Sequence, residues 1–481
     1  MSSRFPTAGR LQFLVALAGL LAASSCGPSG PLDPKRPVVL LVTLDTTRAD
    51  YLGCYGAEFP GISPRIDALA QEGVLFTQAI SQAAVTPVSH ASILTGLWPY
   101  NHELRAMHGQ FHSPLDSGKV TLAEILKEQG YDTGAFVSAL PVTAYFGFDQ
   151  GFDHFDANFG SKQGLAAGVK DGMVNTGGLQ RTAGDTTDAA LAWMQQRDNP
   201  FFLWLHYFDV HDDHMKPPAE EFAGVVFSLD DRTRRRELYR LELTYMDREL
   251  GRVFDSLEAM KLWESAVVIV TSDHGEGLGD HDWWTHGVLY QEQVRVPLIV
   301  KAPGMNAGRR VDSTVRCLDI VPTVADLLKL AADDVPRVDG TSLVPLMNGS
   351  SADLGLMAYA DSVNILTYNT APPDIVDVKD DMLFSILLEN RWKYIQHRRY
   401  RERSELYDLQ VDPMELDNLY LTKPAIAKRA HEALEALGYK PKMPSKQANM
   451  PTELSTGLGK IGYAGGGSDK ELESSEGETP K

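Results

Sequence analysis

Pro37-Val38-Val39-Leu40-Leu41-Val42-Thr43-Leu44 is a continuous apolar, β-branched run that ends directly at Asp45. A run without polar alternation predicts a strand buried on both faces, as in the centre of a mostly parallel sheet. In open α/β sheets the ligand crevice lies at the carboxyl ends of the strands. Asp45 is therefore a candidate site residue, although an aspartate at a strand end also serves as an ordinary turn former.

Two later runs repeat this arrangement. Residues 201–207 are apolar and lead into the polar segment 208–214, which contains Asp209, His211 and His214. Residues 266–271 lead at once into Ser272-Asp273-His274-Gly275-Glu276. Helical patterns lie between the strands, so the chain predicts an α/β fold with a doubly wound, mostly parallel sheet.

The composition is that of a globular protein with ample core-forming material, since 43% of its 481 residues are hydrophobic. Its formal net charge of −19 argues against nucleic acid as a partner, because such binding needs a basic surface. It does not exclude an anionic substrate, because a metal ion and a few basic side chains can invert the charge locally.

The composition and the spacing of predicted strands change along the chain, which predicts its division into domains. Residues 37–350 are expected to form the catalytic α/β domain. Residues 351–440 contain short strands in quick succession and predict a small C-terminal antiparallel subdomain. Residues 457–481 are rich in Gly, Ser and acidic residues, and this composition is typical of a disordered tail.

Residues 1–26 predict a signal peptide. Arg4 and Arg10 precede an apolar run, residues 11–23, that is too short to span a bilayer comfortably. Cys26 follows Ala-Ser-Ser, which resembles a bacterial lipoprotein processing site. We therefore expect export to the periplasm or cell envelope, with the membrane contacted only through a lipid anchor at Cys26. Plain secretion is the alternative.

The stretch from Thr86 to Gly96 resembles a nucleophile turn. A hydroxyl residue precedes Pro87, and Ser89 is a good helix N-cap at the head of an apolar run. Thr86 would then sit at a helix N-terminus, whose unpaired N–H groups suit a phosphate or sulfate. An ordinary proline-containing loop before a capped helix is the plainer interpretation.

Polar residues at three strand ends would converge on one rim of the sheet. Buried carboxylates are costly unless they are paired or bound to metal. A divalent cation held by Asp45, Asp273, His274 and the Thr86 oxygen would neutralise the carboxylates. It would also lower the pKa of the threonine hydroxyl, which is otherwise a weak nucleophile.

These motifs resemble those of the sulfatase family of the alkaline phosphatase superfamily, over most of residues 37–440. The resemblance implies an alkaline phosphatase-like fold and a hydrolase that acts on ester bonds. The segments that carry it are residues 44–53, 86–96, 271–281, 290–300, 319–323, 339–343 and 406–419.

The departures from the family pattern bear on the chemistry. Sulfatases carry a Cys or Ser that is oxidised to formylglycine, where this chain has Thr86, and Thr cannot become that aldehyde. His90 stands at the position of the motif's Arg, and His286 at that of a Lys. Thr46 replaces one acidic metal ligand, and His274 replaces an Asn. Imidazole in place of oxygen ligands favours zinc or manganese, with calcium still possible.

These substitutions resemble the phosphoryl-transfer branch of the superfamily, and the resemblance implies in-line attack by Thr86 on phosphorus. His211 and His286 would hold non-bridging oxygens or donate to the leaving oxygen, and His90 would take part of the missing Arg's role. One metal ion is favoured. The open alternative is a second ion held by Asp209, His211, His214 and His286.

Three functions remain open. The first is a metal-dependent hydrolase or phosphoryl transferase acting on phosphate mono- or diesters. The second is a sulfuric ester hydrolase that works without formylglycine, and the third is a non-catalytic anion-binding member of the family. The expected partner is a small anionic ester: a glycan, a lipid head group or a nucleotide-like molecule. His206 and Arg48 have plainer interpretations, as a core histidine and as a loop anchor.

Overall fold

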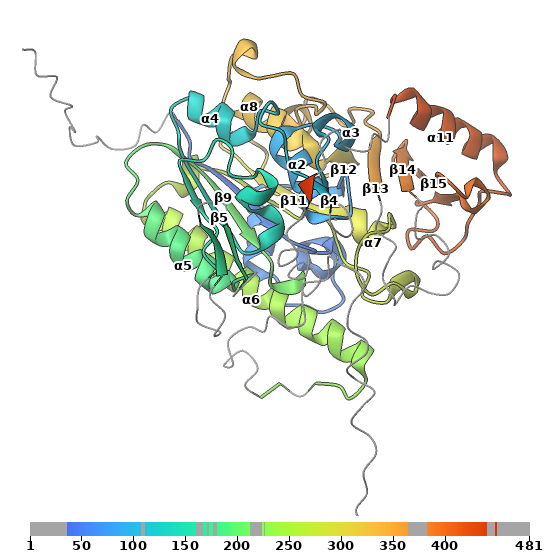
Figure 1. Cartoon of the computed structure of the whole chain (residues 1–481), viewed down its shortest axis with the longest axis horizontal. Helices are drawn as coiled ribbons and strands as arrows, with labels where there is room; N and C mark the ends of the chain where they lie inside the picture. The colour runs from blue at the N-terminus through green and yellow to red at the C-terminus, as the bar shows by residue number, and fades with distance from the viewer. Residues whose placement is uncertain are drawn as a thin grey trace, which may run out of the picture. The chain divides into compact units, whose positions relative to one another are not determined.

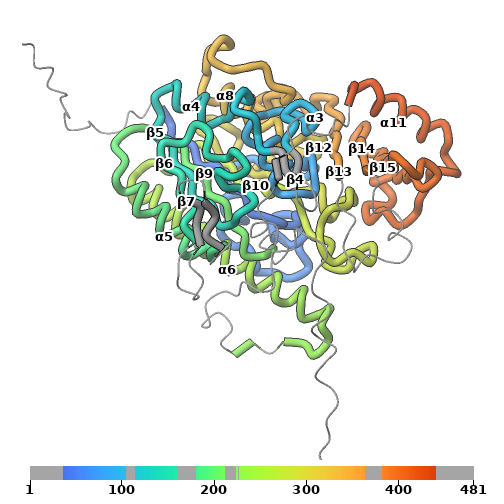
Figure 2. The backbone as a smooth tube through the Cα atoms, viewed as in Figure 1, coloured from blue at the N-terminus to red at the C-terminus, as the bar shows by residue number. Residues whose placement is uncertain are grey.

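In the computed structural model, an eight-stranded sheet organises the chain, with β1 (Val39–Leu44) near its middle (Figure 1). The strand order is β12-β2-β11-β10-β1-β9-β5-β6, and Figure 2 labels β10, β9, β5 and β6 of this sheet on the backbone. The other strands of this sheet are β2 (Val74–Ile80), β5 (Asp132–Val137), β6 (His154–Asp156), β9 (Phe201–Tyr207), β10 (Val267–Thr271), β11 (Arg295–Lys301) and β12 (Arg309–Arg316).

The structure describes one compact unit within residues 32–481. Its described residues are 36–106, 111–159, 167–170, 173–176, 180–211, 224–225, 227–363, 382–439 and 448–449. The predicted signal peptide with Cys26, the acidic tail 457–481 and His214 lie outside these residues. Within the described part, no helix has both the length and the apolar character needed to cross a bilayer.

The predicted α/β class is confirmed, and the sheet is mostly parallel. β1 runs parallel to β9 and β10, and β5 runs parallel to β6 and β9. The exception is β11, which is antiparallel to both of its neighbours. Because β1, β9 and β10 are parallel, the residues that follow them emerge at one edge of the sheet.

Helices cover both faces of the main sheet (Figure 1). Along β1, Val39 and Leu41 belong to one buried cluster with residues of α2, α4 and α8. The alternate residues Leu40 and Val42 belong to a second cluster with residues of α1, α5 and α6. Burial on both sides explains the unbroken apolar run. The helices are α1 (Pro64–Glu72), α2 (Thr86–Thr95), α3 (Pro99–His102), α4 (Leu122–Glu128), α5 (Ala183–Met194), α6 (Asp231–Ala259), α7 (Gln291–Val294), α8 (Ile320–Leu327), α9 (Val344–Met347) and α11 (Pro424–Ala436).

A second sheet is antiparallel and comes late in the chain. Its order is β13-β14-β15-β16, and α11 packs with it in one apolar cluster. The strands are β13 (Ala358–Val363), β14 (Met382–Leu388), β15 (Trp392–His397) and β16 (Glu405–Asp408). The short strands β3 (Arg105–Ala106), β4 (Phe111–Ser113) and β17 (Ala448–Asn449) form one small sheet, and β7 (Ala167–Lys170) and β8 (Met173–Thr176) form another.

The second sheet is connected to the main one through a segment just before α2. The N–H of Asp361 in β13 donates to the carbonyl of Gln82 at 3.0 Å, and Ala83 forms a parallel bridge with Asp361. The hydroxyl of Ser362 donates to the carbonyl of Gly287. Strand β13 therefore holds two segments that border the predicted site.

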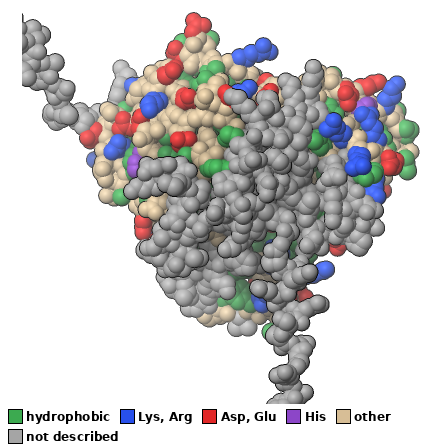
Figure 3. All heavy atoms as spheres, viewed as in Figure 1, with side chains coloured by type: hydrophobic (Ala, Val, Ile, Leu, Met, Phe, Trp, Pro, Cys, Tyr) green, Lys and Arg blue, Asp and Glu red, His purple; other side chains and the backbone are tan. Residues whose placement is uncertain are grey.

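The surface charge is mixed rather than segregated on the face drawn in Figure 3. Basic and acidic side chains are interspersed over its described part.

Candidate active site

The ends of β1 and β10 bring two fully buried aspartates together. Asp45 follows β1 and Asp273 follows β10, and both have 0% exposure. The N–H of Thr46 donates to Asp273 Oδ1 at 3.1 Å, and the N–H of His274 donates to the same atom at 2.8 Å. These two bonds hold Oδ1 of Asp273, and Oδ2 takes no part in them.

Thr86 is the first residue of helix α2 and lies next to the two aspartates. Its hydroxyl lies 3.2 Å from His274 Nε2. His274 Nδ1 faces the carbonyl of Gly275 at 2.9 Å, so Nδ1 carries the proton and the Nε2 lone pair accepts the threonine hydroxyl. Burial lowers the pKa of His274 to about 4, which keeps the imidazole neutral at neutral pH.

The predicted N-cap role of Ser89 is wrong. Helix α2 starts at Thr86, and Val85 precedes it without a side-chain cap bond. Ser89 lies inside the helix, where its hydroxyl donates to the carbonyl of Asp273 at 2.6 Å. Pro87 fits the second position of the helix, where its missing N–H costs nothing. Ser89 therefore fastens the helix start to the Asp273 segment instead of capping it.

His90 lies one helical turn beyond Thr86, and both of its ring nitrogens face protein atoms. Nδ1 donates to the carbonyl of Thr86 at 2.8 Å, and Nε2 accepts from the Thr43 hydroxyl at 3.0 Å. The indole N–H of Trp204 donates to the same Thr43 oxygen at 3.1 Å. His90 is thus placed to hold the backbone of Thr86, and burial lowers its pKa.

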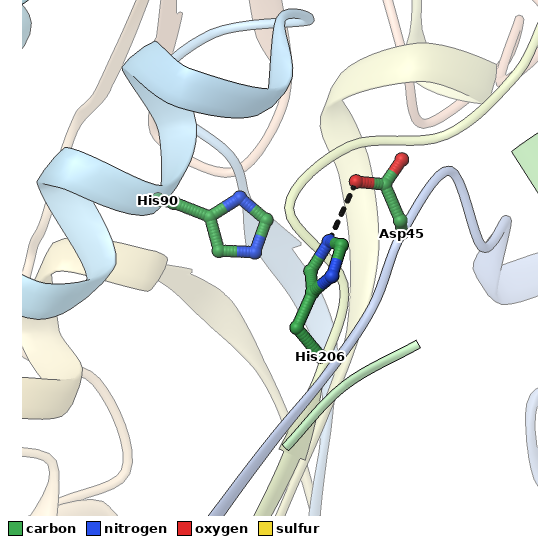
Figure 4. Close-up of side chains that lie close together, drawn as sticks. All are labelled: Asp45, His90 and His206. Carbon is green, nitrogen blue, oxygen red and sulfur yellow. Dashed lines mark hydrogen bonds and ion pairs between the residues drawn. The ribbon is translucent and has the colours of Figure 1, made fainter. Parts of the chain in front are cut away.

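Asp45 has a partner that the sequence did not single out as a site residue. His206, near the end of β9, donates from Nε2 to Asp45 Oδ2 at 3.0 Å (Figure 4). Its Nδ1 accepts from the N–H of Ser138 at 3.3 Å, which fixes the proton on Nε2. The signal was its position: His206 pairs with Thr43 in register on the strand next to β1, two residues before Asp45.

His211 and His286 come together on the far side of His274. Their Nε2 atoms lie 3.1 Å apart, and His286 Nδ1 donates to the carbonyl of Ala84 at 3.0 Å. The His286 proton is therefore on Nδ1, and the contact is an Nε2–H of His211 donating to His286. Burial lowers the pKa of His286 to about 3 and that of His211 well below its ordinary value.

Asp209 lies just before His211, and the backbone engages one of its two carboxylate oxygens, while Oδ2 is buried without a hydrogen-bond partner in the described structure. Its Oδ1 accepts from the N–H of Ala183 at the start of α5, at 3.0 Å. Burial raises the pKa of Asp209 to about 7. Within the described ranges, the potential metal-ligand groups are Asp45 with Asp273 and His274, and Asp45 with His90 and His206.

The residues around Asp45 and Asp273 fit a bound cation. Asp45 Oδ1 and Asp273 Oδ2 are buried and have no hydrogen-bond partner in the described structure. Asp273 Oδ2 lies 3.3 Å from the Nε2 lone pair of His274, so two acceptors face each other. Burial, followed by the charge of Asp273, raises the pKa of Asp45 well above its ordinary value. The surrounding protein therefore leaves this negative charge uncompensated.

Arg48 ties together the two loops that carry the aspartates. It donates to the carbonyls of Glu276 and Gly277, at 3.3 and 3.2 Å, and forms ion pairs with Asp50 and Asp280, each at 2.7 Å. This agrees with the expectation that Arg48 anchors the loop.

Comparison with known proteins places the chain among sulfatases. The family model described as "Sulfatase" matches residues 37–330, more than half of the chain. The model described as "N-sulphoglucosamine sulphohydrolase, C-terminal" matches residues 279–439.

Individual proteins and solved structures are also similar to this chain. The choline-sulfatase of Rhizobium meliloti (strain 1021) is 32% identical over 188 residues, which cover 39% of this chain and 33% of that protein. The multifunctional alkaline phosphatase superfamily protein PehA of Trinickia caryophylli is 25% identical over 480 residues, covering 80% of this chain and 91% of that protein. The crystal structure of the phosphonate monoester hydrolase of Agrobacterium radiobacter has a TM-score of 0.64 at 23% identity, covering 86% of this chain and all of that one.

Proposed function

This chain belongs to the sulfatase family, whose members hydrolyse ester bonds, and from that premise we propose that it cleaves phosphate mono- or diesters, or transfers phosphoryl groups, through Thr86. The observation that carries the proposal is the position of the Thr86 hydroxyl. It lies at a helix start, 3.2 Å from the lone pair of His274 and beside two carboxylates with unpartnered oxygens.

Asp45, Asp273, His274 and Thr86 are proposed to hold one divalent cation, with zinc or manganese favoured over calcium because an imidazole is in the set. When bound, the cation would supply Lewis acidity and lower the pKa of the threonine hydroxyl. One ion is favoured over two, because the candidate ligand groups found among the described residues all include Asp45.

The chain's own residues are proposed to carry out the remaining steps of the reaction. The Thr86 hydroxyl loses its proton to solvent water, its oxygen forms a bond to phosphorus, and the bond from phosphorus to the leaving oxygen breaks. Water then hydrolyses the threonine phosphate ester, which restores the hydroxyl and releases phosphate from a monoester substrate or a phosphate monoester from a diester substrate. His90 holds the Thr86 carbonyl at 2.8 Å, so the nucleophile keeps its orientation.

His211 is proposed to hold a non-bridging oxygen of the substrate with its Nε2–H, and His286, whose own proton is donated to the Ala84 carbonyl, is proposed to orient His211. Both pKa values lie far below neutrality, so the two imidazoles are neutral at pH 7. A neutral imidazole is a poor acid but a good hydrogen-bond donor. We therefore favour a hydrogen bond from His211 Nε2–H to the substrate over protonation of the leaving oxygen, which takes its proton from water.

Sulfate ester hydrolysis without formylglycine is the second candidate, because sulfatases are frequent among the relatives. Attack by the Thr86 hydroxyl on sulfur would leave a threonine sulfate ester, which must then be hydrolysed in turn. Formylglycine avoids that problem, and Thr cannot form it. Phosphorus as the electrophile therefore suits this nucleophile better. The substrate class stays a small anionic ester on a glycan, a lipid head group or a nucleotide-like molecule.

Turnover of aryl phosphate monoesters, aryl phosphate diesters and aryl sulfates, each with zinc, manganese or calcium, tests the proposal. Thr86→Ala is expected to lose at least about a thousand-fold in kcat, because it lacks the nucleophile. Mass spectrometry of quenched wild-type enzyme should show one added phosphoryl group on the peptide that contains Thr86.

Thr95→Ala is the matched control, since Thr95 lies at the other end of the same helix and its hydroxyl donates to the Ala91 carbonyl. It should keep its turnover. Preferred turnover of aryl sulfates would favour the second candidate. No bound metal together with no turnover of any ester would favour a non-catalytic anion-binding protein.

We also propose, from the sequence of residues 1–26, that the protein is exported and carries a lipid anchor at Cys26. Cys26→Ala should release it from the membrane fraction in a soluble form.

A further inference from the structure

Thr46 has an unusual place between the two carboxylates of the site. It directly follows Asp45, and its N–H donates to Asp273 Oδ1 at 3.1 Å. Its side chain has 0% exposure, and its hydroxyl oxygen has no hydrogen-bond partner in the part of the chain that the structure describes. A buried hydroxyl without a partner destabilises a folded protein, so this one calls for an explanation.

The backbone of Thr46 is also strained. Its φ is +50°, in the left-handed region, where a β-branched residue is a genuine outlier. The Tyr239 hydroxyl donates to the Thr46 carbonyl at 2.8 Å, and the N–H of Thr47 donates to the Ser272 hydroxyl at 3.0 Å. Together with the bond to Asp273, these contacts hold the strained conformation from both sides.

Strain and an unpartnered hydroxyl act in the same direction, since both make the metal-free site less stable. Neighbouring Thr47 shows the contrast, because its equally buried hydroxyl donates to the Asp45 carbonyl at 3.4 Å. Two further oxygens near Thr46, Asp45 Oδ1 and Asp273 Oδ2, also lack partners. Three buried oxygens without hydrogen bonds, on residues that contact one another, are the ligand type that a divalent cation takes.

We propose that the Thr46 hydroxyl is a further oxygen ligand of the cation held by Asp45 and Asp273. The inference rests on the proposed metal site and deepens it. A neutral hydroxyl in this position adds an oxygen without adding charge. The site therefore keeps two carboxylates and an imidazole, and a third carboxylate would shift its preference towards calcium.

The test is calorimetric titration of zinc, manganese and calcium into protein stripped with a chelator. Thr46→Val keeps the shape and removes the oxygen, and it is expected to weaken zinc or manganese binding about tenfold or more, since a bond to a charged group is lost. The Tm of the same metal-free variant should rise, because an unpartnered buried hydroxyl has been removed. These opposite signs distinguish a ligand from a structural residue.

Thr46→Ser should bind metal within about threefold of the wild type. Thr46→Asp should raise the affinity for calcium relative to zinc. Thr47→Val is the matched control and should leave metal affinity unchanged. Unchanged zinc and manganese affinity in Thr46→Val would overturn the inference while leaving the metal site itself intact. A wild-type protein that binds none of the three ions would instead remove the proposed function.

Discussion

Two parts of the main sheet bury aspartates in opposite ways. After β12, Asp319 has 0% exposure and accepts from the Arg316 guanidinium at 2.6 to 3.2 Å and from the N–H groups of Arg316 and Thr341 at 2.8 Å. After β1 and β10, Asp45 and Asp273 are equally buried, yet they face each other and neutral imidazoles. Burial and residue type are the same, and only the partners differ.

This difference in partners distinguishes an aspartate that stabilises the fold from aspartates that can bind a ligand. A carboxylate matched by a guanidinium and backbone donors needs nothing from outside the protein. Two carboxylates that share a site without a protein cation are unstable unless a cation arrives. The unbalanced pair, Asp45 with Asp273, therefore lies at the proposed metal site, and the balanced pair, Asp319 with Arg316, stabilises the fold.

The sharpest way to break this comparison is a matched pair of amide substitutions. Asp273→Asn is expected to lose metal binding and at least about a thousand-fold in turnover, since several kcal/mol of charge stabilisation is lost. The metal-free variant should unfold at the same denaturant concentration as the wild type or a higher one, because one of two neighbouring like charges is removed. Asp319→Asn should destabilise the fold by about 3–5 kcal/mol, because it leaves Arg316 buried and unpaired.

Urea unfolding of chelator-treated protein and calorimetry with zinc measure both quantities. Asp319→Asn should retain the zinc affinity of the wild type under conditions where it is folded. A large loss of metal-free stability in Asp273→Asn would show that this aspartate is structural and would remove the distinction between the two regions.

A smaller effect is expected at His206, which orients one of the unbalanced aspartates. His206→Ala removes the donor to Asp45 Oδ2, so the carboxylate is free to rotate, and metal affinity should fall about 10- to 100-fold. His206→Gln keeps a donor in reach and should recover part of that affinity. Equal affinities for wild type, Ala and Gln would mean that Asp45 is held by its backbone alone.

The smallest effect concerns Glu276, which is intermediate between the two cases. It is buried, accepts from the N–H of Gly277 at 3.1 Å, and burial raises its pKa to about 8. Between pH 4.5 and 8 the folded protein keeps a proton that the unfolded chain has lost. Stability should therefore fall as pH rises through that window, by at most about 1.4 kcal/mol per pH unit for this one group.

Glu276→Gln should flatten this dependence in metal-free protein and be more stable than the wild type by at least about 1 kcal/mol at pH 8. At pH 4.5 the two proteins should have nearly equal stability. Urea unfolding at several pH values measures this, and parallel curves for the two proteins would contradict the raised pKa.

Much of the fold could be predicted from the sequence because its strands are buried on both faces. The run at residues 201–207 has the same bounds as β9, and the runs at residues 37–44 and 266–271 contain β1 and β10. Helix α6 begins at Asp231, where its first turn is charged and capped by Asp230. Polar first turns give no apolar signal, so helix starts are harder to predict than strand cores.

The site could be predicted in part. Parallel strands bring their ends together, so Asp45 and Asp273 were expected near each other. The contributions of His206 and Thr46 could not be predicted, because they depend on side-chain direction and on a local φ of +50°. Ser89 was assigned to a cap because its type suits one, and only the helix start at Thr86 shows its contact with Asp273.

The place of β13 also makes the proposed metal site depend on a late part of the chain. Gln82 to Ala84 lie between β13 on one side and His286, which donates to the Ala84 carbonyl, on the other. The segment that leads into Thr86 therefore takes up its observed contacts only when both the loop with His286 and the late strand β13 are in place. A chain without β13 would lack part of the support of the proposed metal site, so this site depends on a strand that comes after β1 and β10, which carry the two aspartates.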